Sequence, residues 1–190
     1  EEIGYLLNGG ISNPITAIEQ ITYLFFMKKI DEVESKKERD ADWNEEVYRS
    51  RFDGEYTPWI DENDYRPSPE MPEQERAELA KKREEALKPR PKNELRWSYF
   101  SKAPMAAEDM LLHVRNNVFP FIKEMNDDTS AFTKYMKDAV FRIQKPSLLV
   151  EAVKKVDEIF VEIARDAEDG KQSFQDIQGD VYEMLLKEIA

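Results

Sequence analysis

Apolar side chains recur every three or four residues between Ser12 and Glu34, a spacing typical of one buried face of a helix. The predicted face comprises Ile15, Ile18, Ile21 and Phe25. Further apolar residues lie well outside that face, at Leu24, Phe26, Met27, Ile30 and Val33. A helix that is apolar on most sides is normally central, with other elements packed around it. We therefore predict that this segment forms the central helix of the fold.

Residues at the start of this helix suit a helix N-terminus. Asn13 or Ser12 can accept a hydrogen bond from a free backbone amide, and Pro14 fits the first helical position, where no N–H is needed. The unbroken apolar run covers only residues 21–27 and has polar residues on both sides. A membrane span needs about 20 mostly apolar residues. We therefore expect no association with a membrane.

The helical spacing disappears over a long segment, at about residues 35–95. Charged residues dominate there, and the segment holds six of the ten prolines. One polar helix is predicted over Glu73–Leu87, with too few apolar residues to be buried. A connection of this length is usually functional or mobile. We call the segment an excursion from the helical fold.

Helical spacing returns after residue 105. The predicted helices cover Ala106–Val118, a segment from Thr129 or Ser130 to Ile143, a segment from Ser147 to Gly170, and a segment from Asp180 to the end. Pro120 predicts a kink or break in an apolar run. No strand pattern of convincing length and no internal repeat is present. We therefore predict an all-α fold: an irregular helical bundle with a long charged, proline-containing excursion between the first long helix and the C-terminal helices, in one domain over residues 1–190.

Composition narrows the possible functions. The formal net charge of −12 disfavours broad attraction to nucleic acid or anionic lipid. The chain has no cysteine, which excludes disulfides and thiolate metal sites and favours an intracellular, cytoplasmic location. Charge is also segregated along the chain, with 17 acidic and 7 basic side chains over residues 31–80. Residues 81–102 reverse this balance, with 8 basic and 3 acidic side chains.

The most suggestive basic stretch is KPRPKNELRWSYFSK, residues 88–102. Cationic side chains contact phosphates, so a DNA-binding surface is one interpretation, and ordinary solubility or contact with a protein is the other. The cations concerned are Lys88, Arg90, Lys92, Arg96 and Lys102. Aromatic residues in the same stretch can stack on bases or anchor the segment to the core. We favour anchoring for Trp97 and Phe100.

No catalytic centre is predicted. His113 is the only histidine, which rules out a histidine-rich metal site and indicates a structural or surface role. Carboxylate pairs at helical spacing, such as Glu158 with Glu162, fit a solvated face. The chain contains no phosphate-binding glycine loop and no G-x-S-x-G nucleophile motif. We therefore assign no catalytic, cofactor-binding or metal-binding residue.

Three pieces of the chain resemble a known family. The segment Gly10–Pro14 leading into ITYLFFMKKIDEVE is similar to the opening helix of the modification (M) subunit of type I restriction–modification systems. Arg96-Trp97-Ser98 lies where that family commonly has a similar tryptophan. The closing GDVYEMLLKEIA, residues 179–190, resembles the family's Gly-Asp-x-Tyr-Glu-x-Leu-Leu element. The resemblance spans nearly the whole chain.

The resemblance implies the N-terminal helical domain of a larger enzyme. In that family a methyltransferase domain follows, binds S-adenosylmethionine and methylates the exocyclic amine of adenine in DNA. That domain is expected after residue 190. This fragment is expected to bind no cofactor, because the family's glycine-containing cofactor motif is not present in it. Its Asn13-Pro14 continues as Ile15-Thr16 and not as the family's catalytic motif, so no catalytic residue is implied. The implied partners are a specificity subunit, a second modification subunit, a restriction subunit and double-stranded DNA, which the helical domain helps to enclose.

A second hypothesis is a stand-alone acidic helical protein that imitates DNA or binds a protein partner. The net charge and the predicted helix content fit it. The abrupt apolar ends of the chain, which suggest a fragment, and the family resemblance argue against it. A hydrolase that uses carboxylates has only chance pairs in its favour.

Overall fold

The computed structural model describes residues 10–125, 136, 138–169, 180 and 184. Helices dominate this part of the chain, and its only strands are β1 (Glu55–Tyr56) and β2 (Arg90–Pro91), so the predicted all-α class is confirmed. Residues 1–9, where the sequence also predicts the last turns of a helix, the predicted helix start at residue 129 or 130 and the predicted helix end at Gly170 lie outside the described residues. Of the predicted final helix, residues 180 and 184 are described, and both are helical.

The central helix, α2, runs from Pro14 to Trp43 and is longer than predicted. Its N-terminus has the predicted cap, because Oδ1 of Asn13 accepts a hydrogen bond from the amide of Ile15 at 2.9 Å. The apolar spacing ends near Glu34, but the next nine residues remain helical. All of them except Ala41 and Trp43 are polar, and charged side chains on the second half of α2 bind the excursion, as described below. The prediction ended the helix too early because it followed the apolar residues alone.

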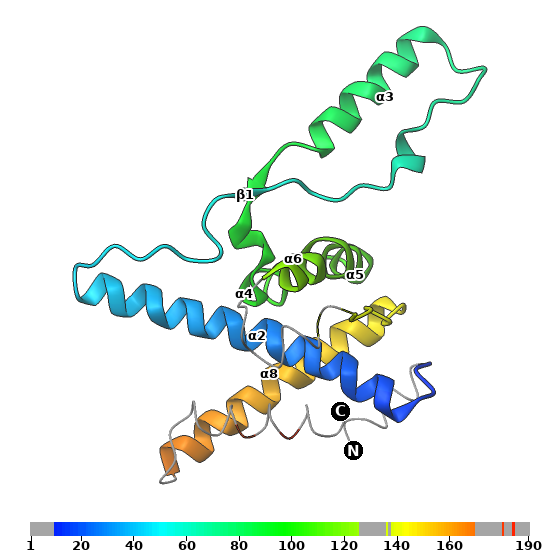
Figure 1. Ribbon diagram of the computed structural model, residues 1–190. Coiled ribbons are helices and arrows are strands. Elements are labelled where there is room, and N and C mark those ends of the chain that lie inside the picture. Colours follow the sequence, from blue (N-terminus) through cyan, green and yellow to red (C-terminus); the bar gives the residue numbers. More distant parts are fainter. Residues whose placement is uncertain (1–9, 126–135, 137, 170–179, 181–183, 185–190) are drawn as a thin grey trace.

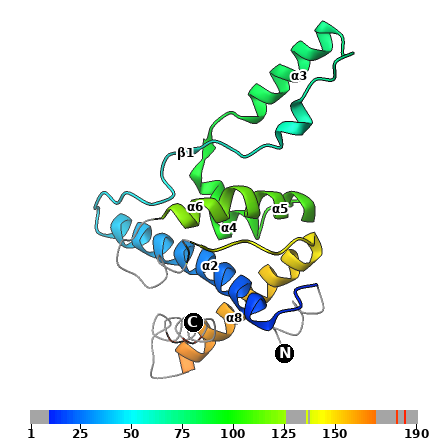
Figure 2. The same cartoon turned by 45° about the vertical axis from the view of Figure 1, so that its right-hand side comes forward.

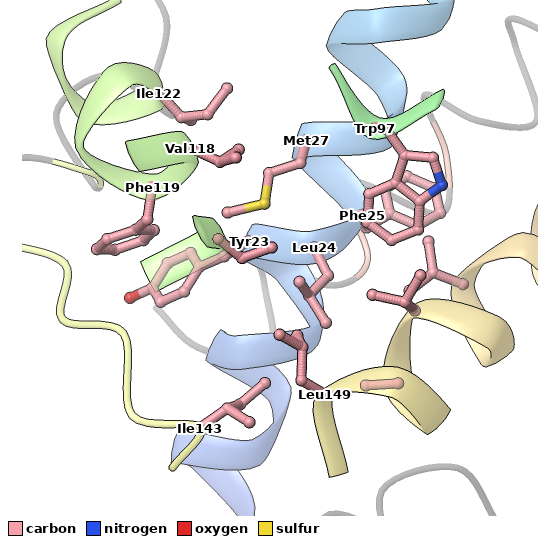
Figure 3. Packing of buried hydrophobic residues seen from close by; sticks show 14 of the residues in the cluster. Tyr23, Leu24, Phe25, Met27, Trp97, Val118, Phe119, Ile122, Ile143 and Leu149 are labelled. Atoms are coloured by element: carbon pink, nitrogen blue, oxygen red, sulfur yellow. The ribbon is translucent and has the colours of Figure 1, made fainter. Parts of the chain in front are cut away.

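Figure 3 shows the centre of the core around α2, with Leu24 and Phe25 completely buried. The ring of Tyr23 packs 5.4 Å from that of Phe119, and the ring of Phe25 packs 4.6 Å from that of Phe160. These contacts join one helix to neighbours on several sides, as a helix that is apolar on most sides requires. The prediction of a central helix is therefore confirmed.

One predicted core position was wrong. Ile15 is 54% exposed, whereas Gln20 is completely buried. Nε2 of Gln20 donates to the carbonyl of Val140 at 3.1 Å, and its Oε1 accepts from the amide of Arg142 at 2.8 Å. The segment around Val140 and Arg142 therefore packs against the side of α2 that carries Gln20 and leaves Ile15 in solvent.

The same hydrogen bonds explain a second difference. We predicted a helix continuing to Ile143, but residues 139–145 have no helical structure. The amide side chain of Gln20 satisfies two backbone groups of this stretch that a helix would otherwise pair. Ile143 is nevertheless completely buried. Helical spacing identified a buried side chain and assigned it to the wrong backbone conformation.

The predicted helix over Ala106–Val118 is present, with an altered turn at its end. Helix α5 (Ala107–His113) continues into η3, a π-helix over Val114–Val118, and then into α6 (Phe119–Glu124). The amide of Phe119 donates to the carbonyl of Val114, five residues earlier. Pro120, which has no N–H, follows this widened turn directly, so the chain accommodates the proline with a π-turn. The apolar spacing of this segment indicates its core positions correctly, because all four residues of that face are buried: Met110, Leu111, Val114 and Val118.

Helix α8 (Pro146–Asp169) crosses α2 and also packs against α5 (Figure 1). Its amphipathic pattern predicts the buried face correctly. That face is formed by Leu149, Ala152, Val153, Val156, Phe160 and Ile163. Together α2, α5 and α8 enclose most of the core.

The excursion forms an arm that projects from this body (Figures 1 and 2). We define the arm as residues 55–91. At its base β1 and β2 pair antiparallel, with Glu55 opposite Pro91 and Tyr56 opposite Arg90. The arm contains η1 (Glu62–Tyr65) and α3 (Glu73–Ala86), and no residue of α3 is buried, as predicted. The chain then re-enters the body through η2 (Lys92–Leu95) and α4 (Trp97–Phe100).

Candidate functional site

The aromatic residues of the basic stretch anchor it to the core. Trp97 and Phe100 are buried, and their rings meet edge-on with centroids 5.3 Å apart. The indole Nε1 of Trp97 donates to Oδ1 of Asp157 in α8 at 2.8 Å. Lys28 of α2 forms an ion pair with the same carboxylate at 3.0 Å. The anchoring interpretation is therefore confirmed, and α4 is bound to both α2 and α8.

Arg96 binds α2 in the structure. Its side chain is only 12% exposed and forms ion pairs with Asp31, at 2.9 Å, and with Glu38. The guanidinium also lies over the ring of Phe52, 4.5 Å from its centroid. Arg96 therefore holds the returning end of the excursion on the central helix.

A second carboxylate on α2 holds the outgoing end. Glu34, whose side chain is 1% exposed, accepts hydrogen bonds from the hydroxyl of Tyr48 at 2.9 Å, the amide of Arg51 at 3.0 Å and Oγ of Ser50 at 3.3 Å. Burial by itself raises the pKa of Glu34, but these donors and the nearby charges of Lys37 and Arg51 outweigh it and lower the pKa below its ordinary value. Burial and the bond to Glu34 raise the pKa of the Tyr48 hydroxyl to about 12.

We call this group of contacts the clasp. Its members are Asp31, Glu34, Glu38, Tyr48, Ser50, Arg51 and Arg96. The clasp fixes the two ends of the excursion to one stretch of α2, less than three helical turns long. The arm therefore projects from a rigidly attached base.

The arm also has hydrogen bonds of its own. Arg83 in α3 donates to both carboxylate oxygens of Glu62 in η1, at 2.8 Å and 2.6 Å. Arg76 donates to the carbonyls of Met71 and Pro69, at 2.8 Å and 2.7 Å. These bonds connect α3 with η1 and with the turn that precedes α3. The arm is thus a defined substructure with almost no hydrophobic core of its own.

The five predicted DNA-binding residues lie in different environments. Lys88 and Arg90, at the base of the arm, are 63% and 57% exposed and form surface ion pairs with Glu85 and Glu94. Lys92 lies over the ring of Phe121, 5.8 Å from its centroid. Lys102 is exposed at the end of α4. The cations of the stretch are therefore divided between the arm, the body and the clasp.

Lys102 lines a hollow of about 380 Å³ between α2, α4 and α8. Lys36 and Arg39, on the exposed side of α2, line the same hollow. The apolar spacing of α2 gave no indication of these two cations, because it ends before them while the helix continues. Their spacing of three residues places them on one helical face. A prediction that extended the helix past Glu34 would therefore have identified them as a pair of neighbouring cations.

The comparison with protein families gives a match over residues 5–156, to the model described as the HsdM N-terminal domain. This match covers most of the chain. The protein belongs to the HsdM N-terminal domain family, the N-terminal domain of the type I restriction–modification modification subunit. Searches of curated proteins and of solved structures gave no significant match.

The match gives the clasp and the arm a family context. Residues 5–156 include α2, the whole arm, the clasp and the first half of α8. The long excursion therefore lies within the range that the family model matches. The match gives no support to the alternative of a stand-alone DNA mimic.

The single histidine of this HsdM N-terminal domain has a structural environment. Nε2 of His113 lies 2.8 Å from the carbonyl of Glu94 and donates to it in the neutral tautomer. The ring also packs near those of Tyr99 and Phe100. Burial lowers the pKa of His113, and the bond to Glu94 offsets this only in part. His113 therefore ties α5 to η2 as a neutral side chain at pH 7.

The residues that the structure describes contain no group of three or more His, Cys, Asp or Glu side chains arranged to hold a metal ion. None of their helices is long and apolar enough to cross a bilayer.

Proposed function

We propose that this domain is a clamp and docking domain of a type I restriction–modification DNA methyltransferase, and that it contributes to subunit assembly and to the enclosure of DNA. The observation that carries the proposal is the family match over residues 5–156. In this proposal the chemistry belongs to a methyltransferase domain after residue 190, which binds S-adenosylmethionine and methylates adenine. The domain described here holds and positions the other components.

The clasp and the arm support a positioning role. A projecting element can position a partner only if its base is rigid. The clasp provides that rigidity through the buried ion pair of Arg96 with Asp31 at one end of the excursion and the hydrogen bonds to buried Glu34 at the other. The arm carries ten acidic and seven basic side chains. This mixed surface suits contact with protein more than uniform attraction to DNA.

For contact with DNA, we propose the exposed cations Lys88, Arg90 and Lys102. Lys92 is half-buried and is a secondary candidate. Arg96 differs from these, because its guanidinium is occupied by two carboxylates of α2. A substitution of Arg96 would act through the fold, so it cannot report on DNA contact.

The proposed partners are a specificity subunit, a second modification subunit, a restriction subunit and double-stranded DNA, in the cytoplasm. The test uses the full-length modification subunit in a reconstituted assembly, with and without residues 1–190. We expect the truncated subunit to assemble poorly and to bind DNA more weakly, as measured by analytical ultracentrifugation and fluorescence anisotropy. An unchanged assembly and an unchanged affinity would contradict the proposal.

A charge-reversal variant tests the DNA surface separately. Lys88→Glu combined with Arg90→Glu and Lys102→Glu should weaken DNA binding and reduce its dependence on salt, because fewer counterions are released. Lys154→Glu, at an exposed position on α8, is the matched control and should leave both unchanged. If the triple variant and the control behave alike, these cations do not face DNA.

A further inference from the structure

The C-terminal end of α2 presents the two most exposed large apolar side chains among those that the structure describes. Trp43, the last residue of α2, is 88% exposed, and Val47 is fully exposed just beyond the turn that follows. Figure 1 shows this end of α2 pointing away from the rest of the body, where α2 turns into the excursion. We call residues 40–47 the tip. Trp43 contributes nothing to the core of this domain.

The tip has a fixed conformation. The amide of Asn44 donates to the carbonyl of Asp40 at 3.1 Å, and the amide of Glu46 donates to the carbonyl of Ala41 at 2.8 Å. Glu45 has φ of 57°, a left-handed conformation that residues other than glycine rarely adopt. Immediately beyond the tip, Tyr48 is bound to Glu34 in the clasp. The chain is therefore anchored on both sides of Trp43 and Val47.

Four exposed carboxylates surround the apolar pair. Asp40, Asp42, Glu45 and Glu46 form no ion pair with any described residue. This negative rim opposes binding to DNA phosphates and to anionic lipid. It also opposes a second copy of the chain, whose net charge is −12. The rim complements a positively charged surface.

We propose that the tip docks onto another protein subunit, in an apolar socket bordered by lysine and arginine side chains. This inference rests on the assembly role proposed above and assigns that role a surface and a kind of partner. An exposed tryptophan on a fixed backbone, inside a charged rim, has the composition of an interface hot spot, where a large apolar side chain supplies affinity and the rim supplies orientation. Because the tip is already ordered, little conformational entropy is lost on docking.

The test uses the full-length modification subunit and its purified specificity and restriction subunits. Trp43→Ala should weaken assembly by about tenfold or more, as expected for removal of a tryptophan hot spot. Ile15→Ala is the matched control, because Ile15 is an exposed apolar residue at the other end of the same helix. Neither substitution should change the thermal midpoint of the isolated subunit, since neither side chain is buried.

A photo-crosslinking amino acid at Val47 identifies the occupant. We expect a crosslink to a site on the specificity or restriction subunit that is rich in lysine and arginine, and we expect it to disappear in Trp43→Ala. A crosslink to DNA or to a second modification subunit, or wild-type assembly of Trp43→Ala, would overturn the inference. Deletion of residues 1–190 separates the two proposals. If the deletion impairs assembly and Trp43→Ala does not, only the docking surface is wrong; if neither does, the assembly role itself fails.

Discussion

Nη1 of Arg96 lies 2.9 Å from Oδ1 of Asp31, although the two residues are 65 positions apart in the chain. The other carboxylate oxygen of Asp31 accepts a hydrogen bond from the amide of Ser98 at 2.8 Å. One buried carboxylate on the central helix therefore binds both the side chain and the backbone of the segment that leaves the arm. These two contacts hold the returning end of the excursion against the body of the domain.

Replacement of Arg96 should strongly destabilise the domain. Arg96→Met leaves Asp31 and Glu38 without their cation in a largely buried site, and loss of one partner of a buried ion pair costs about 3–5 kcal/mol. Arg90→Met is the control, because Arg90 makes only a surface pair and should cost about 1 kcal/mol or less. Urea denaturation of the isolated domain measures both. Equal effects of the two substitutions would contradict a structural role for Arg96.

Acid should weaken the clasp through Glu34. The pKa of this carboxyl is lower in the folded state than the value of about 4.3 expected in the unfolded chain. Ionised Glu34 therefore stabilises the fold above that value, and the stabilisation is lost as the pH falls through the folded-state pKa. Glu34→Gln should show a smaller loss of unfolding free energy between pH 6 and pH 3 than the wild type. Parallel curves for the two proteins would show that Glu34 is not the responsible group.

His113 should titrate below its ordinary pKa. It is the only histidine, so its imidazole resonances in an NMR titration are unambiguous. Burial disfavours the charged form, so we expect a midpoint below the usual value of about 6.5. The unfolded chain then binds the proton first, and stability should fall as the pH drops below about 6.5. His113→Gln should remove this part of the pH dependence, and a midpoint at or above 6.5 would contradict the buried, neutral assignment.

Two substitutions on α2 should separate its buried and exposed sides. Leu24→Ala removes a completely buried side chain and should cost about 2–5 kcal/mol, including the cavity that it leaves. Ile15→Ala removes an exposed side chain and should change stability by no more than about 0.5 kcal/mol. Thermal or chemical unfolding of the two variants provides the measurement. A large effect at Ile15 would contradict its exposed position and support the buried position that the sequence pattern predicted.

Sequence patterns were most successful where burial and helical period coincide. The cap at Asn13, the core positions of α5 and the buried face of α8 all follow from apolar spacing and capping chemistry. Sequence patterns failed where the hydrogen bonds of a polar side chain determine the backbone conformation. The side chain of Gln20 bonds the carbonyl of Val140 and the amide of Arg142, which would pair with other backbone groups in a helix. The spacing of nearby apolar residues does not indicate this.

The basic stretch shows the same division. Its composition correctly indicated that Trp97 and Phe100 anchor it to the core. The same composition grouped Arg96 with Lys88 and Arg90, whereas the structure pairs Arg96 with carboxylates more than 50 residues earlier. Only distances through space separate a cation bound to carboxylates from one open to a partner.

By itself, the sequence determined the helical class, the central position of α2 and the solvent-exposed character of α3, because these depend on local spacing and on the cost of leaving apolar surface in water. The tertiary structure alone decided that α2 continues to Trp43, that the clasp closes the two ends of the excursion, and that Trp43 remains in solvent. The clasp depends on ion pairs and hydrogen bonds between residues far apart in the chain, and the exposure of Trp43 depends on which elements pack against α2. Neither leaves a periodic pattern in the sequence.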